Sequence, residues 1–145
     1  MKVLVRIVCL CLVVLTLAIA TPAYASSPAA TSRSAFNKED FANKDFSGRD
    51  FKGIEFTEVN LRNADLHGAN MSNGIAYLTK FTGANLSEAI FEEAILLRST
   101  FDGANIDGAD FSFAVLDGPQ LKKLCAAATG VNPVTGISTA ESLGC

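Results

Sequence analysis

One spacing constrains this 145-residue chain more than any other feature: a large apolar residue recurs at every fifth position from Phe36 to Leu116. The seventeen positions of the series are Phe36, Phe41, Phe46, Phe51, Phe56, Leu61, Leu66, Met71, Ala76, Phe81, Leu86, Phe91, Leu96, Phe101, Ile106, Phe111 and Leu116. Only Ala76 interrupts the large residues. A period of five fits neither the 3.6 residues of a helix nor the alternation of a flat strand, so it indicates a repeat architecture.

A second column of small residues accompanies the first, two positions earlier in each repeat. Its members are Ala64, Ala69, Gly74, Ala84, Ala89, Ala94, Ser99, Ala104, Ala109 and Ala114. If the chain turns one corner per repeat, four repeats bring it back above its start and make a square coil of twenty residues. The large and small residues then point inward, while the remaining polar and glycine-rich positions point outward. Residues 35–118 are therefore predicted to form an all-β solenoid of about four coils, stacked at strand spacing.

The repeat resembles the pentapeptide-repeat proteins, whose consensus is Ala-Asp/Asn-Leu/Phe-x-x. The consensus stands almost literally in residues 64–68, 84–88, 104–108 and 109–113. The square cross-section follows from the spacing alone. The resemblance adds the handedness, because it implies a right-handed quadrilateral β-helix.

The first 25 residues have the pattern of a cleavable secretory signal peptide. Lys2 and Arg6 precede an apolar stretch over residues 7–20, and Ala23-Tyr24-Ala25 offers a cleavage site. An uncleaved anchor is the alternative, although fourteen residues fall short of the roughly twenty that span a bilayer. We expect cleavage, no stable membrane insertion afterwards, and a flexible lead-in over residues 26–34.

The two ends of the column need separate treatment, because open ends of a solenoid must be capped. At the N-terminal end, Glu39, Lys44 and Arg49 occupy the small inward positions, where unpaired burial is costly. This first coil is therefore expected either to splay or to place its charged heads at the rim.

Residues 119–145 are predicted to form a helical C-terminal cap. Pro119 suits a first helical position, Gly130 a stop, and Ser138 with Glu141 a capping box for a final turn. An apolar stripe at helical spacing lies between them: Leu121, Leu124, Cys125 and Ala128.

Cys125 and Cys145 are the two cysteines that remain after signal removal. In an exported protein such a pair indicates a disulfide, which here would join the final turn to the capping helix. A metal pair is the weaker alternative, because neither a histidine nor a third cysteine lies nearby.

Aligning the sequence by twenty residues divides it into four walls, one of which is polar. This wall carries Ser47, His67, Ser87 and Asp107 in one outward column. A hydrolytic triad also needs an oriented base and an oxyanion hole, which a flat solvated wall does not offer. We therefore predict no catalytic residues, no cofactor site and no metal site.

Another wall is apolar on its outward side. The residues of this apolar wall are Ile75, Tyr77, Leu78, Ile95, Leu97, Phe113 and Val115. Such a patch usually marks a contact surface. Three explanations are open: the tail over residues 131–145 folds over it, a protein partner or a second copy docks on it, or a local bulge turns Ile75 inward beside the small Ala76.

Charge and the chain's ending narrow the function. Without the signal, ten basic and fifteen acidic residues remain, which argues against nucleic acid as a partner. The segments 121–125, 130–136 and 142–145 resemble the ending of the thylakoid-lumen pentapeptide-repeat proteins of cyanobacteria and chloroplasts. We predict a non-enzymatic protein-interaction module, exported to the thylakoid lumen or the periplasm, that requires no cofactor. The alternative is a DNA-mimicking, topoisomerase-binding relative, which the export signal and the short column disfavour.

Overall fold

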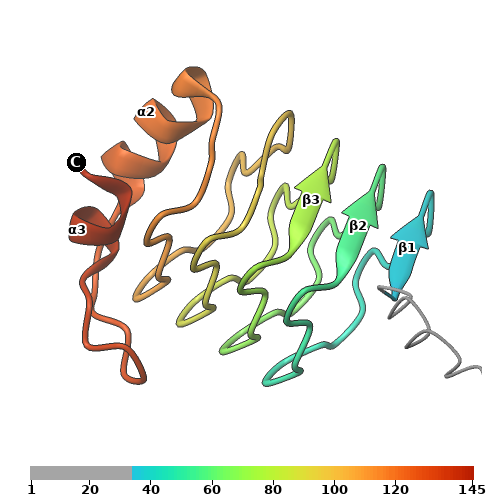
Figure 1. The fold of residues 1–145 in the computed structure, drawn as a ribbon, viewed down its shortest axis with the longest axis horizontal. Helices are drawn as coiled ribbons and strands as arrows, with labels where there is room; N and C mark the ends of the chain where they lie inside the picture. Colours follow the sequence, from blue (N-terminus) through green and yellow to red (C-terminus); the bar gives the residue numbers. More distant parts are fainter. Residues whose placement is uncertain (1–33) are drawn as a thin grey trace, which may run out of the picture. The chain divides into compact units, whose positions relative to one another are not determined.

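The computed structural model describes residues 34–145. The predicted signal peptide and residues 26–33 of the predicted lead-in lie outside the described residues. Within the described part, the chain winds through stacked coils and ends in two short helices (Figure 1).

Parallel pairing between residues twenty apart holds the coils together. Strands β1 (Ala35–Asn37), β2 (Glu55–Thr57) and β3 (Ile75–Tyr77) form one parallel sheet in the order β1-β2-β3. Phe56 lies between Phe36 and Ala76 in this register, and single bridges continue the same wall from Ile75 through Ile95 to Val115. Equivalent bridges at the same spacing run up the other three walls, so each coil takes twenty residues.

The core is the interior of this column. The large residues from Phe56 to Phe111 point inward and are at most 4% exposed. Phenyl rings one coil apart lie nearly parallel, as in Phe81 over Phe101 and Phe91 over Phe111, with centroids 5.0 Å apart in both pairs. The small inward residues fill the corners between them, and Ala64, Ala69, Ala84 and Ala89 are fully buried.

Two inward hydroxyls replace alanine at one corner. Thr79 Oγ1 donates to the Phe56 carbonyl at 2.9 Å, and Ser99 Oγ donates to the Ala76 carbonyl at 2.6 Å. Because burying a hydroxyl is costly only when it lacks a partner, these bonds explain how polar residues fit the interior.

The corners require left-handed backbone in the last position of the repeat. Gly68 and Gly108 adopt it with φ of 62° and 68°, where glycine has no steric penalty. Leu78 and Phe113 adopt the same conformation with φ of 55° and 58°, although apolar side chains rarely do. Both corner side chains belong to the apolar wall.

The first coil does not splay. Phe41 N–H donates to the Asn60 carbonyl at 2.8 Å, and the ladder continues regularly along the other walls. Glu39, Lys44 and Arg49 are exposed at the rim, so their charges stay in water.

Helices α2 (Gly118–Ala127) and α3 (Thr139–Leu143) lie over the C-terminal end of the column (Figure 1). Pro119 stands in the first turn of α2, and Leu124 is its buried residue. The helix ends at Ala127, with Ala128 as the C-cap, so it stops before the predicted Gly130. Ser138 caps α3 by accepting the N–H of Glu141 at 3.2 Å.

Candidate interaction surface

The apolar wall occupies the C-terminal part of the face that begins with β1, β2 and β3. Ile75, Ile95 and Val115 stack through consecutive parallel bridges, and their column continues downward into Glu55 and Ala35. The column is therefore apolar at Ile75, Ile95 and Val115, and the charged Glu55 interrupts it one coil closer to the N-terminus.

Exposure differs across this wall. Phe113 is 81% exposed, Val115 48% and Ile95 38%. Ile75, Tyr77, Leu78 and Leu97 are half-buried. Because positions on either side of an inward residue must point outward, the repeat itself forces these side chains toward solvent. Exposing them costs hydrophobic free energy that a contact would recover.

A bulge at Ile75 is wrong as an explanation of the wall. Ile75 N–H donates to the Ile54 carbonyl at 3.1 Å, in register with its neighbours. Ala76 points inward and is 1% exposed. The ladder leaves no extra residue that could reverse the side chains, so Ile75 stays on the outer face.

The tail leaves most of the wall uncovered, since Ile95, Phe113 and Val115 stay exposed. The Asn132 side-chain amide donates to the carbonyls of Glu88 and Gly108, at 3.0 and 2.9 Å. Gly108 N–H in turn donates to the Thr129 carbonyl at 2.8 Å. Asn132 is buried, and its amide satisfies two backbone carbonyls at a corner of the polar wall. These bonds hold the start of the tail at that corner.

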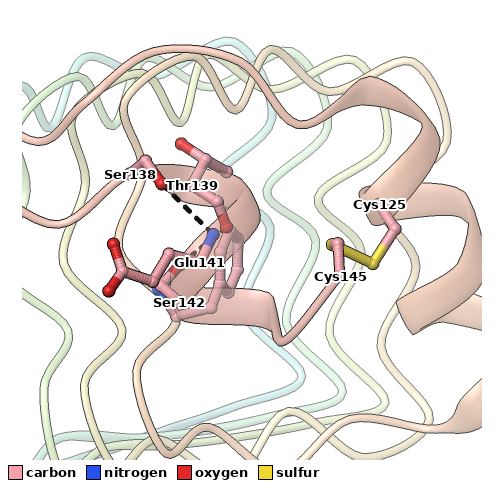
Figure 2. Close-up of a disulfide and its surroundings, with 7 residues drawn as sticks. Cys125, Ser138, Thr139, Glu141, Ser142 and Cys145 are labelled. Atoms are coloured by element: carbon pink, nitrogen blue, oxygen red, sulfur yellow. Dashed lines mark hydrogen bonds between the residues drawn. A yellow bond between two sulfur atoms is a disulfide. The ribbon is translucent and has the colours of Figure 1, made fainter.

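The rest of the tail closes the end of the column. Thr139 Oγ1 donates to the Ile106 carbonyl, and Ser142 Oγ accepts the N–H of Phe111 at 3.0 Å. Cys145 is joined to Cys125 by a disulfide, with Cα atoms 5.6 Å apart, which ties α3 to α2 (Figure 2). Lys123 on α2 also bonds Asp102 of the last coil, and this ammonium holds the pKa of the carboxyl below its usual range.

Two adjoining grooves extend the apolar wall over the edge of this cap. One has a volume of about 280 Å³ between the last coil and α2, and the other about 470 Å³ beside Phe113 and α3. Ala114, Ser142 and Leu143 line both. Sequence reasoning missed these grooves, because they depend on where the cap docks.

The polar wall brings His67 and Ser87 together without making a nucleophile. His67 Nδ1 lies 3.0 Å from Ser87 Oγ, and its Nε2 lies 3.8 Å from a Glu88 carboxylate oxygen. However, Ser87 donates its hydroxyl proton to Asn85 Oδ1 at 2.7 Å, so it accepts from His67. A general base must instead accept the proton of the nucleophile.

The other members of that wall form local turns. The backbone N–H and hydroxyl of Ser47 donate to Asp45 at 2.9 and 2.7 Å, and they lower the pKa of its carboxyl. Within residues 34–145, no three His, Cys, Asp or Glu side chains gather as metal ligands. Among the described helices, none is long and apolar enough to cross a membrane.

Comparison with known proteins finds a matching family and a partly matching relative. The model of the pentapeptide-repeat family matches residues 40–75 and 79–118, in eight copies. Over 37 residues, the chain is 60% identical to the chloroplastic thylakoid lumenal protein TL20.3 of Arabidopsis thaliana, a match covering 26% of this chain and 13% of TL20.3.

Two solved structures are also similar. HetL, a pentapeptide repeat protein involved in heterocyst differentiation regulation from the cyanobacterium Nostoc sp. strain PCC 7120, aligns with a TM-score of 0.55 and 21% identity. That alignment covers 57% of this chain and 35% of HetL, and it shows the fold alone. A pentapeptide repeat protein from the Arabidopsis thaliana thylakoid lumen is 30% identical, with a TM-score of 0.33, over 79% of this chain and 90% of the other.

Proposed function

Because this chain belongs to the pentapeptide-repeat family, we propose that it is a non-enzymatic module that binds another protein through its apolar wall. One observation carries the proposal: Phe113, Val115 and Ile95 remain exposed on the side of a tightly packed column. A rigid surface loses little conformational entropy when it binds, so such a wall suits recognition.

The compartment we propose is oxidising and outside the cytoplasm, either the thylakoid lumen or the periplasm. Support comes from the secretory pattern of residues 1–25, from the bonded pair Cys125 and Cys145, and from the similarity to thylakoid-lumen proteins.

Binding to a topoisomerase by DNA mimicry has weaker support. The acidic residues are interrupted on the outer surface by Lys52, Arg62, Lys80 and Arg98. A DNA mimic needs a continuous negative field, which these cations break.

Paired variants test whether the wall is a free surface. The wild-type protein, purified after export, is compared with a variant carrying Ile95→Asp and Leu97→Lys by light scattering after size exclusion and by urea unfolding. We expect the variant to fold with nearly unchanged stability. A variant that cannot fold would show that the wall is covered by the protein's own chain and would overturn the proposal.

Site-specific photocrosslinking then tests binding in the compartment. A photoreactive residue at Val115 is expected to give a discrete protein adduct that disappears when Ile95→Asp is added. The same residue at Asn105, which is exposed on the polar wall, serves as the matched control. Equal adducts at both positions, or none at Val115, would contradict binding through the wall.

A further inference from the structure

The N-terminal end of the column is a second apolar surface, separate from the apolar wall. Phe36, Phe41, Phe46 and Phe51 are only half-buried there, whereas Phe81 in the interior is fully buried. Each of the four rings meets the next edge to face, and the last meets Phe56 in the same way, with centroids 5.2 to 5.6 Å apart. The end of the column is thus an aromatic floor.

The backbone around this floor is an open sheet edge. In the second coil, Asn60 N–H donates to the Glu39 carbonyl and the Asn60 carbonyl accepts from Phe41. Asp40 holds the equivalent position one coil earlier, and across residues 34–145 its N–H and C=O have no backbone partner. The same is true of Asp45 and Asp50. Such an edge can pair with another strand.

The opposite end cannot supply that strand. α2 and α3 cover it, and the hydroxyls of Thr139 and Ser142 already bond the backbone of the last coil. Head-to-tail stacking of columns is therefore blocked. A second copy can add its own edge only by meeting N-terminal end to N-terminal end, which gives a closed two-fold dimer.

The chain before the first coil is a poor cover for the floor. If the signal is removed after Ala25, residues 26–33 precede the described part, with the sequence Ser-Ser-Pro-Ala-Ala-Thr-Ser-Arg. These eight residues contain no large apolar side chain and are too few for a coil of twenty.

We infer that two copies of this protein stack through their first coils, with β1 pairing antiparallel to the same strand of the partner. In this register Phe36 faces its symmetry mate, and Phe41 faces Phe51 of the partner subunit. Asp40 then faces Lys52 of the partner subunit twice, once on each side of the axis. No like charges of the first coil oppose one another, and the apolar walls of the two copies lie on the same side of the dimer.

Charge reversal tests this register without touching the aromatic floor. Asp40 and Lys52 are both exposed. The exported wild-type protein is expected to be a dimer by sedimentation at about 1–500 µM, a range chosen because the interface is small. Lys52→Glu alone, or Asp40→Lys alone, places like charges together twice and is expected to weaken the dimer at least about tenfold.

Mixing the two single variants supplies the decisive readout. In an equimolar mixture both facing pairs become opposite in charge again, so a heterodimer of near wild-type affinity is expected. Lys122→Glu, an equal charge change at the capped end, serves as the control and leaves the dimer intact. Thermal unfolding of each variant separates lost association from lost folding.

Three results would overturn the inference. The first is a wild-type monomer throughout the range, which would mean that the floor is covered by the protein's own N-terminal residues or kept for another protein. The second is a dimer whose affinity is unchanged by Lys52→Glu but lost in the variant with Ile95→Asp and Leu97→Lys. That result would place self-association on the apolar wall. The third is a mixture that stays as weak as the single variants, which would exclude the register.

Discussion

Ile95 and Val115 pair across a parallel bridge between neighbouring coils, and both side chains nonetheless stay exposed, at 38% and 48%. The next residue in the chain after Ile95, Leu96, is 1% exposed. Adjacent residues of similar size therefore sit in opposite environments, since one points to solvent and the other to the core.

This contrast predicts very different costs for two neighbouring substitutions. Leu96→Ala is expected to lower the free energy of unfolding by about 2–5 kcal/mol, because it opens a cavity in a close-packed column. Ile95→Ala should cost less than about 1 kcal/mol, because its side chain is partly in water already. Urea unfolding measures both, and equal losses would show that the wall is buried in the folded protein.

Ser99 gives a second prediction, because its hydroxyl stands in place of the direct hydrogen bond that closes the turn at other corners. At other corners the N–H of the small residue bonds directly to a carbonyl three residues earlier, as Ala84 bonds Phe81 at 2.9 Å. Here Thr79 N–H donates to Ser99 Oγ at 3.0 Å, and Ser99 donates to the Ala76 carbonyl.

Ser99→Ala therefore leaves the buried Thr79 N–H and the buried Ala76 carbonyl without the hydroxyl that joins them. We expect a loss of about 1–3 kcal/mol, measured by urea unfolding. Thr82→Ala is the control, since Thr82 is half-buried and its hydroxyl bonds another hydroxyl, that of Thr100 at 3.2 Å, and no backbone group within residues 34–145. An unchanged stability of Ser99→Ala would mean that the turn closes directly between Thr79 and Ala76.

The column could be predicted from sequence because each inward position is set by local spacing. The same alignment by twenty residues brought His67 beside Ser87, although it could not show that Ser87 donates to Asn85. The path of the tail was not predictable in this way. It depends on Asn132 donating to Glu88, 44 residues away, and no repeat or periodic pattern marks that contact.

The disulfide gives a third prediction. Replacing Cys125 and Cys145 with serine frees a loop of twenty residues and is expected to cost about 3 kcal/mol. The loss should be concentrated in α3, which is otherwise held by the buried Leu143 and by hydrogen bonds of Thr139 and Ser142. Amide hydrogen exchange would show whether the loss of stability lies in α3. A reducing agent added to the wild type should cause the same increase in exchange. Unchanged exchange in α3 would show that the helix docks without the crosslink.

The ion pair of Asp102 and Lys123 predicts how the cap responds to acid. The Lys123 ammonium lowers the pKa of Asp102 in the folded protein, relative to about 3.9 in an unfolded chain. A lowered folded pKa contributes stability above the unfolded value, and this contribution is lost as the pH falls through the folded pKa. The melting temperature of Asp102→Asn should therefore lie slightly below that of the wild type at pH 7, and the two melting temperatures should converge near pH 2.

Salt and a control variant separate charge from packing. Because Asp102 and Lys123 are both exposed, about 1 M salt should also narrow the difference in melting temperature at pH 7. Glu92→Gln removes an exposed carboxylate that has no ion pair in the described part of the chain, and should show no such trend. A gap between wild type and Asp102→Asn that persists at pH 2 would mean that Asp102 acts through packing and not through its charge.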